Sequence, residues 1–120
     1  MKTLLVVMII LGMGFFALNA EAFCVYNRTD TKIWVEQTGG GKPFKLFSAK
    51  LDPGTHGCCH WENKDCNNEG KRDSIVEFGV TWSAGLFGNP SICHGFPIKA
   101  GGYVLVKGKN GVYNCEGHGY

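Results

Sequence analysis

Short apolar runs separated by turn residues are the dominant pattern of residues 23–120. The clearest run covers residues 74–82, where every second position from Val76 to Trp82 is apolar and the positions between are polar or small. A period of two puts alternate side chains on one face, so this run predicts a strand with one buried side. No apolar stripe at helical spacing extends over three turns after residue 22. The pattern therefore predicts an all-β fold.

The other runs are rich in Val, Ile, Phe, Trp and Tyr and are bounded by Gly, Pro, Asn and Asp. Together the runs predict strands at residues 23–27, 31–37, 44–51, 55–61, 74–82, 91–99, 103–107 and 112–116. An Asn110-Gly111 pair between the last two runs is typical of a two-residue hairpin. Seven or eight short strands with frequent turns predict a small antiparallel β-sandwich, with a β-barrel as the alternative.

The first 22 residues have the three-part pattern of a secretory signal peptide. Lys2 supplies a positive start, residues 4–18 are almost entirely apolar, and Ala20 and Ala22 form a small-residue cleavage site. Cleavage after Ala20 or Ala22 is open, with Ala22 preferred. An uncleaved anchor is the alternative, and it would also place the rest of the chain outside the cell. The sequence thus predicts a secreted, extracellular protein with one domain, residues 23–120.

Six cysteines follow the predicted signal peptide: Cys24, Cys58, Cys59, Cys66, Cys93 and Cys115. In a short exported domain this number predicts a disulfide-stapled fold with three bonds. Fifteen pairings are open to six cysteines. Cys58 and Cys59 are adjacent on a predicted strand and point to opposite faces, so they should have different partners. Cys24 and Cys115 lie near the two ends of the predicted mature chain, where a bond would hold both termini. The pairing favoured on these two grounds is Cys24–Cys115, Cys59–Cys66 and Cys58–Cys93.

Charge and motif content argue against several classes of function. A formal net charge of +2 is too small for the basic footprint of a nucleic-acid-binding protein. No Gly-x-Ser-x-Gly motif is present, and no cysteine is expected to be free as a nucleophile. Residues 56–60 combine His and Cys without a Cys-x-x-Cys pair, and residues 63–74 miss the glycine and the last glutamate of a calcium loop. We therefore expect no enzyme activity, no cofactor and no metal.

Aromatic and apolar side chains in exposed contexts are the best candidates for binding. Ile33 and Val35 should share the inner face of their strand, which places Trp34 outside as a flat stacking surface. Trp61, beside the loop that contains Cys66, is a second candidate. Leu86 and Phe87 lie between two glycines and form an apolar loop tip. The alternative is that these side chains cover the core of a small domain.

Asn27-Arg28-Thr29 is an acceptor sequence for N-glycosylation in a predicted turn. In a secreted chain it predicts a glycan on Asn27.

Several segments carry a resemblance to known proteins. They are residues 23–27 with Thr29, residues 33–35, residues 51–54, residues 58–61 and residues 66–67. In these the chain resembles small secreted cysteine-rich proteins of filamentous fungi. Its opening is also similar, more distantly, to thaumatin-like and aegerolysin-like β-sandwiches. The resemblance implies secretion and a β-sandwich, and it implies no catalytic residue.

The leading hypothesis is a monomeric, non-enzymatic binding module or effector-like protein that acts outside the cell on a glycan, a cell wall or a protein surface. Trp34, Trp61, Leu86 and Phe87 would make the contacts. The weak positive charge and the apolar tip support an alternative, a membrane-active toxin or antimicrobial protein, and only then would a membrane be a partner. A third alternative is a small secreted hydrolase, based on the acidic loop at residues 62–73.

Overall fold

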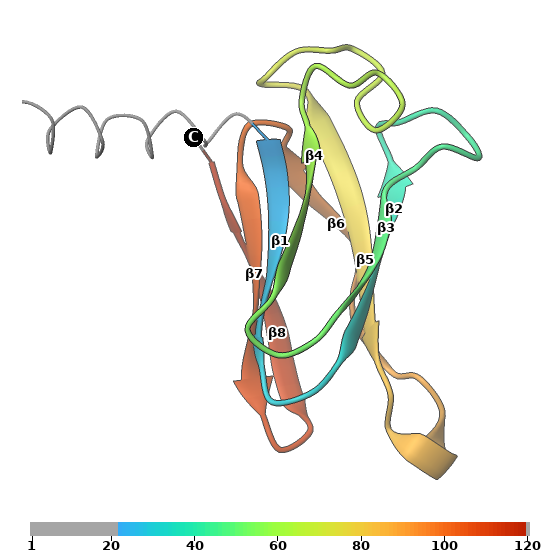
Figure 1. The fold of residues 1–120 in the computed structure, drawn as a ribbon, viewed down its shortest axis with the longest axis vertical. Coiled ribbons are helices and arrows are strands. Elements are labelled where there is room, and N and C mark those ends of the chain that lie inside the picture. Colours follow the sequence, from blue (N-terminus) through green and yellow to red (C-terminus); the bar gives the residue numbers. More distant parts are fainter. Residues whose placement is uncertain (1–21, 120) are drawn as a thin grey trace, which may run out of the picture.

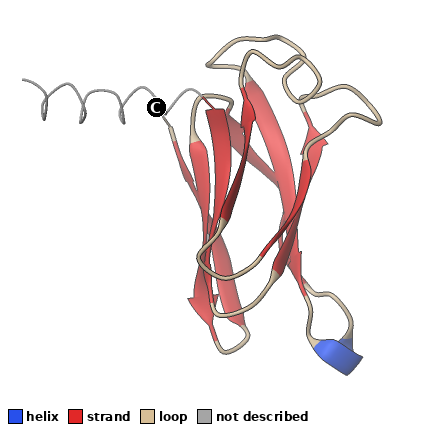
Figure 2. Ribbon diagram, viewed as in Figure 1, coloured by secondary structure: helices blue, strands red, loops and turns tan. Residues whose placement is uncertain are grey.

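The computed structural model describes residues 22–119, and every long element within them is a β-strand (Figure 2). The strands are β1 (Ala22–Thr29), β2 (Ile33–Gly39), β3 (Ser48–Leu51), β4 (His56–His60), β5 (Ile75–Trp82), β6 (Ser91–Lys99), β7 (Tyr103–Lys109) and β8 (Val112–His118). One turn of 3-10 helix, η1 (Gly85–Phe87), interrupts the β5–β6 connection. The predicted signal peptide falls on residues 1–21, which lie outside the described residues, and on Ala22, where β1 begins.

The strands form two four-stranded sheets that pack face to face (Figure 1). The first sheet has the order β4-β1-β7-β8 and the second has the order β3-β2-β5-β6. The predicted sandwich is confirmed, and the fold is not a closed barrel. One pairing differs from a wholly antiparallel sandwich, because β1 and β7 run parallel. These two strands are far apart in the sequence, so no tight hairpin forces them to be antiparallel.

The core lies between the sheets and is built from their alternating inward side chains. The first sheet contributes Phe23, Val25, Val104 and Val106, and the second contributes Ile33, Val35, Val76, Phe78, Val80 and Ile98. The rings of Phe23 and Phe78 meet edge to face across the two layers, with centroids 5.1 Å apart. Trp82, expected in the core, is only half-buried and packs against its margin.

Two local predictions have different outcomes. The β7–β8 hairpin turns through Asn110 and Gly111, whose φ angles of 56° and 83° fit a turn of the I′ class, as predicted.

The strand predicted at residues 44–51 begins only at Ser48. Phe44 has a φ of 68°, a left-handed conformation that an extended strand cannot contain. Its side chain is fully exposed.

The three disulfides are Cys24–Cys58, Cys59–Cys66 and Cys93–Cys115. The prediction is confirmed for Cys59–Cys66 and for the different partners of Cys58 and Cys59, and it is wrong for the other two bonds. Cys24 and Cys58 lie directly opposite each other on the neighbouring strands β1 and β4. Cys93 on β6 and Cys115 on β8 link the two sheets, with their Cα atoms 6.3 Å apart. Both pairings depend on sheet topology, which the spacing of cysteines does not contain.

Candidate binding site

Trp34 lies on the outer face of the second sheet, as its strand pattern predicts. Its neighbours Ile33 and Val35 are buried in the core, whereas the indole of Trp34 is half-buried. The register places Trp34 between Lys50 on β3 and Thr81 on β5. Because β2 is paired with a strand on each side, the backbone that carries Trp34 is held in place. This favours a rigid contact surface.

The outer face is hollowed on both sides of this tryptophan. A hollow of about 260 Å³ lies toward β3 and includes Glu36 and Lys50 in its wall. A second hollow, of about 340 Å³, extends from Trp34 across β5 to β6. We call this second hollow the Trp34 groove; its polar side chains are Glu36, Thr38, Thr81, Asn89, Ser91 and His94. The two hollows share Trp34 and Glu36.

Gly79 gives the Trp34 groove its depth. It lies directly opposite Glu36, on the outward side of β5 between the buried Phe78 and Val80. A Cβ at this position would lie 3.4 Å from Cγ2 of Thr38 and 3.6 Å from Nδ1 of His94, which is ordinary van der Waals contact. A side chain therefore fits here without a backbone clash, and its absence leaves the floor of the groove open.

The groove combines an aromatic face with many groups that form hydrogen bonds. Threonine and serine hydroxyls donate and accept, the Asn89 amide does both, and the carboxylate of Glu36 accepts. An indole ring offers an apolar face to the C–H side of a flat ring, and the surrounding polar groups can orient its hydroxyls. Glu36 is the one carboxylate of the groove, and Lys50, which lines the neighbouring hollow, places a positive charge on the other side of Trp34. This arrangement suits a polar ligand without net charge.

Trp61 does not join this site. It follows β4, which belongs to the first sheet, and its ring packs against the hydrophobic core. The ring also stacks on the imidazole of His60, with centroids 5.6 Å apart. Its Nε1 atom is buried and has no hydrogen-bond partner within residues 22–119. Trp61 therefore makes packing contacts, and the structure does not bring it together with Trp34, because it lines neither of the two hollows beside that residue.

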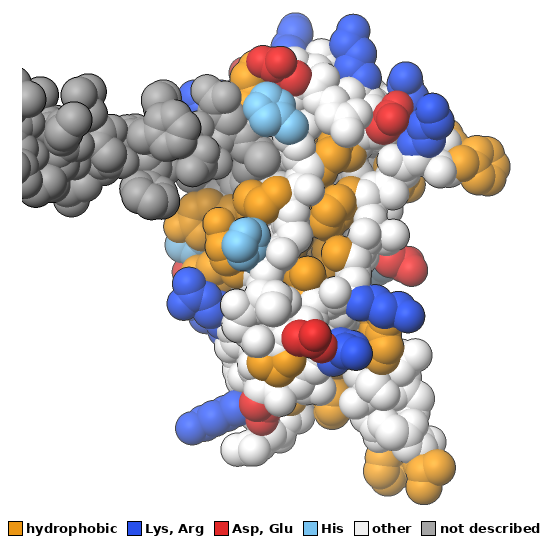
Figure 3. All heavy atoms as spheres, viewed as in Figure 1, with side chains coloured by type: hydrophobic (Ala, Val, Ile, Leu, Met, Phe, Trp, Pro, Cys, Tyr) orange, Lys and Arg blue, Asp and Glu red, His pale blue; other side chains and the backbone are white. Residues whose placement is uncertain are grey.

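Leu86 and Phe87 form the exposed tip that the flanking glycines predict. They belong to η1, and their side chains have relative exposures of 104% and 90%. Figure 3 shows hydrophobic side chains protruding at the end of the β5–β6 loop. Asn89, which lines the Trp34 groove, follows this tip two residues later. The tip thus adjoins one end of the groove.

A second apolar tip was not predicted. Phe44, in the β2–β3 loop, is as exposed as Leu86, and the two loops lie at opposite ends of the second sheet (Figure 1). The three glycines before Lys42 and the proline after it are turn signals that extend the loop to Phe44.

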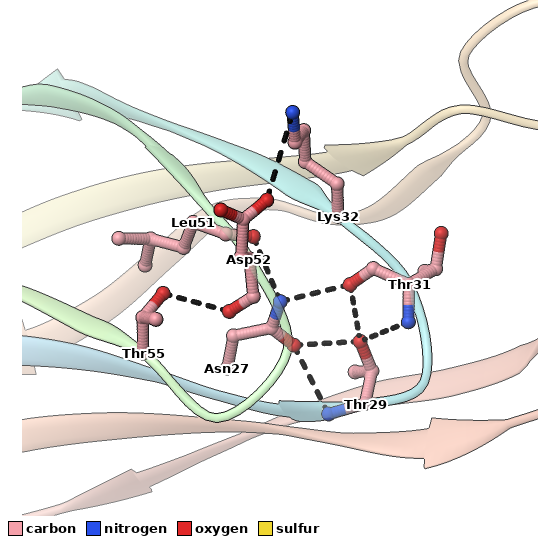
Figure 4. A network of polar contacts seen from close by, with 7 residues as sticks. All are labelled: Asn27, Thr29, Thr31, Lys32, Leu51, Asp52 and Thr55. Carbon is pink, nitrogen blue, oxygen red and sulfur yellow. Dashed lines mark hydrogen bonds and ion pairs between the residues drawn. The ribbon is translucent and has the colours of Figure 1, made fainter.

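The structure does not support the predicted glycan on Asn27. This side chain is fully buried, and its Nδ2 atom donates hydrogen bonds to the carbonyl oxygens of Thr31 and Leu51 (Figure 4). Its Oδ1 atom accepts from the backbone N–H and the hydroxyl of Thr29. Both amide hydrogens are therefore used inside the protein, and the nitrogen has no room for a sugar. Asn27 instead joins the turn after β1 to the end of β3.

Neither the acidic loop nor the potential metal ligands form a metal site in the described part of the chain. Within residues 22–119, no three His, Cys, Asp or Glu side chains lie close enough together to hold a metal ion. In the acidic loop, Asp65 pairs with Lys42 at 3.5 Å, and Glu62, Glu69 and Asp73 are exposed. The described part of the chain also has no helix long and apolar enough to cross a membrane.

Comparison with models of protein families, with curated proteins and with solved structures found no match to this chain. Function is therefore inferred from the side chains that the fold brings together.

Proposed function

We propose that this chain is a secreted, non-enzymatic carbohydrate-binding module that holds a neutral oligosaccharide in the Trp34 groove. The observation that carries the proposal is the half-buried indole of Trp34 on a central strand, beside a groove of about 340 Å³ with polar walls. A pyranose ring stacked on the indole would place its hydroxyls against the groove walls.

The extracellular part of the proposal has separate support. All six cysteines are paired, which fits an oxidising compartment. The pattern of residues 1–22 is that of a signal peptide, and the resemblance to secreted fungal proteins agrees with it. The three disulfides hold the sheets and the loop at residues 62–73 in place, so the groove needs little reordering on binding.

Two variants test the groove in different ways. Trp34→Ala removes the stacking surface, and Gly79→Val fills the floor while keeping the indole. We expect each to weaken binding to a neutral polysaccharide about tenfold or more, which corresponds to about 1.4 kcal/mol. Phe44→Ala is the matched control, because it removes another aromatic ring, one that is fully exposed and outside the groove.

The measurement is retention of the oxidised protein on chitin, β-glucan and mannan, followed by titration with the matching oligosaccharides. Near-UV circular dichroism of each variant shows whether it is folded. Lack of retention on every neutral glycan, or equal retention of wild type and Trp34→Ala, would remove the proposal.

A membrane-active protein is the second candidate, and one observation favours it. The adjacent side chains Leu86 and Phe87 protrude into solvent at a loop tip, an arrangement that can enter the interface of a bilayer. Leakage of vesicles that contain anionic lipid tests it. A Leu86→Ser/Phe87→Ser double variant should abolish leakage if the tip inserts, and absence of leakage by wild type excludes this function.

A further inference from the structure

A row of four aromatic side chains crosses the outer face of the first sheet. Tyr26 on β1 stacks on His56 of β4, with centroids 5.0 Å apart, and Tyr103 on β7 stacks on His118 of β8 at 4.8 Å. The two tyrosine rings meet at 5.9 Å. Figure 3 shows histidine and hydrophobic side chains gathered over β1 and β4. This row lies on the opposite side of the sandwich from the Trp34 groove.

The two tyrosines form a corner. Their ring planes are inclined by 82°, and a hollow of about 290 Å³ is lined by Tyr26, Tyr103, Leu105 and Arg28. Each phenol ring is held on another side by an imidazole, which limits its freedom to turn. Walls that are fixed before a ligand arrives lose little conformational entropy on binding.

The hollow carries one uncompensated positive charge. Arg28 on β1 lies directly opposite Lys107 on β7, and like charges at such positions repel. Lys107 is compensated by Glu116, whose carboxylate lies 2.6 Å from Nζ and also contacts His118 at 2.7 Å. Within residues 22–119, Arg28 has no carboxylate partner. An anion in the hollow would therefore offset charge that the protein leaves unpaired.

We propose that this corner binds a uronic-acid unit of an acidic polysaccharide. The guanidinium of Arg28 matches a carboxylate with two parallel hydrogen bonds, and the phenol faces accept the apolar side of the sugar ring. One unpaired cation in a hollow of this size fits one negative charge per ring. A sulfated glycan carries several charges per unit and would need several cations. The corner is separate from the Trp34 groove, and the proposal does not depend on the neutral ligand.

The experiment is calorimetric titration of the oxidised, full mature chain with oligogalacturonate. Arg28→Gln and Tyr103→Ala should each weaken binding about tenfold. Arg28→Lys keeps the charge without the fork and should also weaken it. Lys45→Gln is the matched control, because it removes one exposed positive charge outside the corner and should leave binding unchanged. A neutral oligosaccharide titrated in parallel reports on the Trp34 groove separately.

Several results would overturn the proposal. The first is that the wild-type chain shows no saturable binding of oligogalacturonate. The second is that Lys45→Gln weakens binding as much as Arg28→Gln, which would indicate attraction by net charge alone. Heparin or polyglutamate bound as tightly, with the same dependence on Arg28, would replace a uronate site by a general anion surface. Anionic vesicles bound in the same Arg28-dependent way would replace it by a membrane-binding face.

Discussion

The phenol of Tyr113 donates a hydrogen bond of 2.6 Å to Oδ1 of Asp30, and the backbone N–H of Asn110 donates to Oδ2 of the same carboxylate at 2.9 Å. These bonds connect the turn after β1 to the β7–β8 hairpin at the end of the first sheet. The hydrogen bond from Tyr113, and then that from Asn110, lowers the pKa of Asp30 below its ordinary value of 3.8. The same bond raises the pKa of Tyr113 above 10.0.

The Asp30–Tyr113 bond predicts a specific pH dependence of stability. A carboxyl group whose pKa is lower in the folded state stabilises the fold above its unfolded pKa, and this contribution is lost as the pH falls through the folded pKa. Tyr113→Phe removes the main cause of the shift and keeps the ring that packs on Trp82. We expect the urea midpoint to fall less between pH 6 and pH 3 for this variant than for wild type. Identical pH dependence of the two proteins would contradict the role of this bond.

The buried hydrogen bonds of Asn27 predict that its substitution by alanine causes a large loss of stability. Asn27→Ala leaves the buried carbonyl of Leu51 and the backbone N–H of Thr29 without their partners. Unpaired buried polar groups cost about 1–3 kcal/mol each, so we expect a loss of about 3 kcal/mol in urea unfolding. Arg28→Gln, one residue away and exposed, should change stability by less than about 0.5 kcal/mol.

The burial of Asn27 also predicts that the acceptor sequence is not glycosylated in the folded protein. Secreted from a eukaryotic host, the folded protein should have the intact mass of a chain without a sugar on Asn27. A folded, disulfide-bonded fraction that carries a glycan on this residue would show that Asn27 is accessible and that the network in Figure 4 is not formed.

Trp61 should matter for stability and leave glycan binding unchanged. Its ring packs against the core, and its indole N–H has no partner among residues 22–119. Trp61→Ala should lower the free energy of unfolding by about 2 kcal/mol, which is less than for a fully buried tryptophan. Trp61→Phe should lower it by about 1 kcal/mol, because the variant loses buried apolar area and no hydrogen bond. Differential scanning fluorimetry gives the order. A loss of glycan binding in folded Trp61→Phe would restore Trp61 to the binding surface.

The sequence predicts most of what depends on neighbours along the chain. Alternation of apolar residues locates β5, and the Asn110-Gly111 pair locates the last hairpin. The same alternation places Trp34 outside, so the main feature of the groove is predictable. Gly79, as the floor of the groove, is visible only once β2 and β5 are in register.

Features made by distant strands could not be predicted. Tyr26 and Tyr103 meet because β1 inserts beside β7 in parallel, and no local pattern encodes that pairing. The burial of Asn27 depends on the carbonyl of Leu51, which β3 brings from another sheet. The expectation of a glycan rests on the local acceptor sequence alone, and the burial of Asn27 argues against it. In each case the sequence identifies the residue types correctly, but it does not show which residues from distant strands surround them.

Removal of the disulfides should separate global from local stabilisation. Cys93–Cys115 closes a loop with a sequence separation of 22 and links the two sheets, whereas Cys59–Cys66 closes a separation of 7 and ties one loop to β4. Loop-closure entropy gives about 3 kcal/mol for the first bond and about 2 kcal/mol for the second. We expect Cys93→Ala/Cys115→Ala to lower the global unfolding free energy by the larger amount and to speed hydrogen exchange in both sheets. Cys59→Ala/Cys66→Ala should speed exchange mainly at residues 62–73. Equal exchange in β6 and β8 before and after loss of Cys93–Cys115 would mean that the core alone fixes the two sheets, and that the covalent link between them is dispensable for displaying the groove.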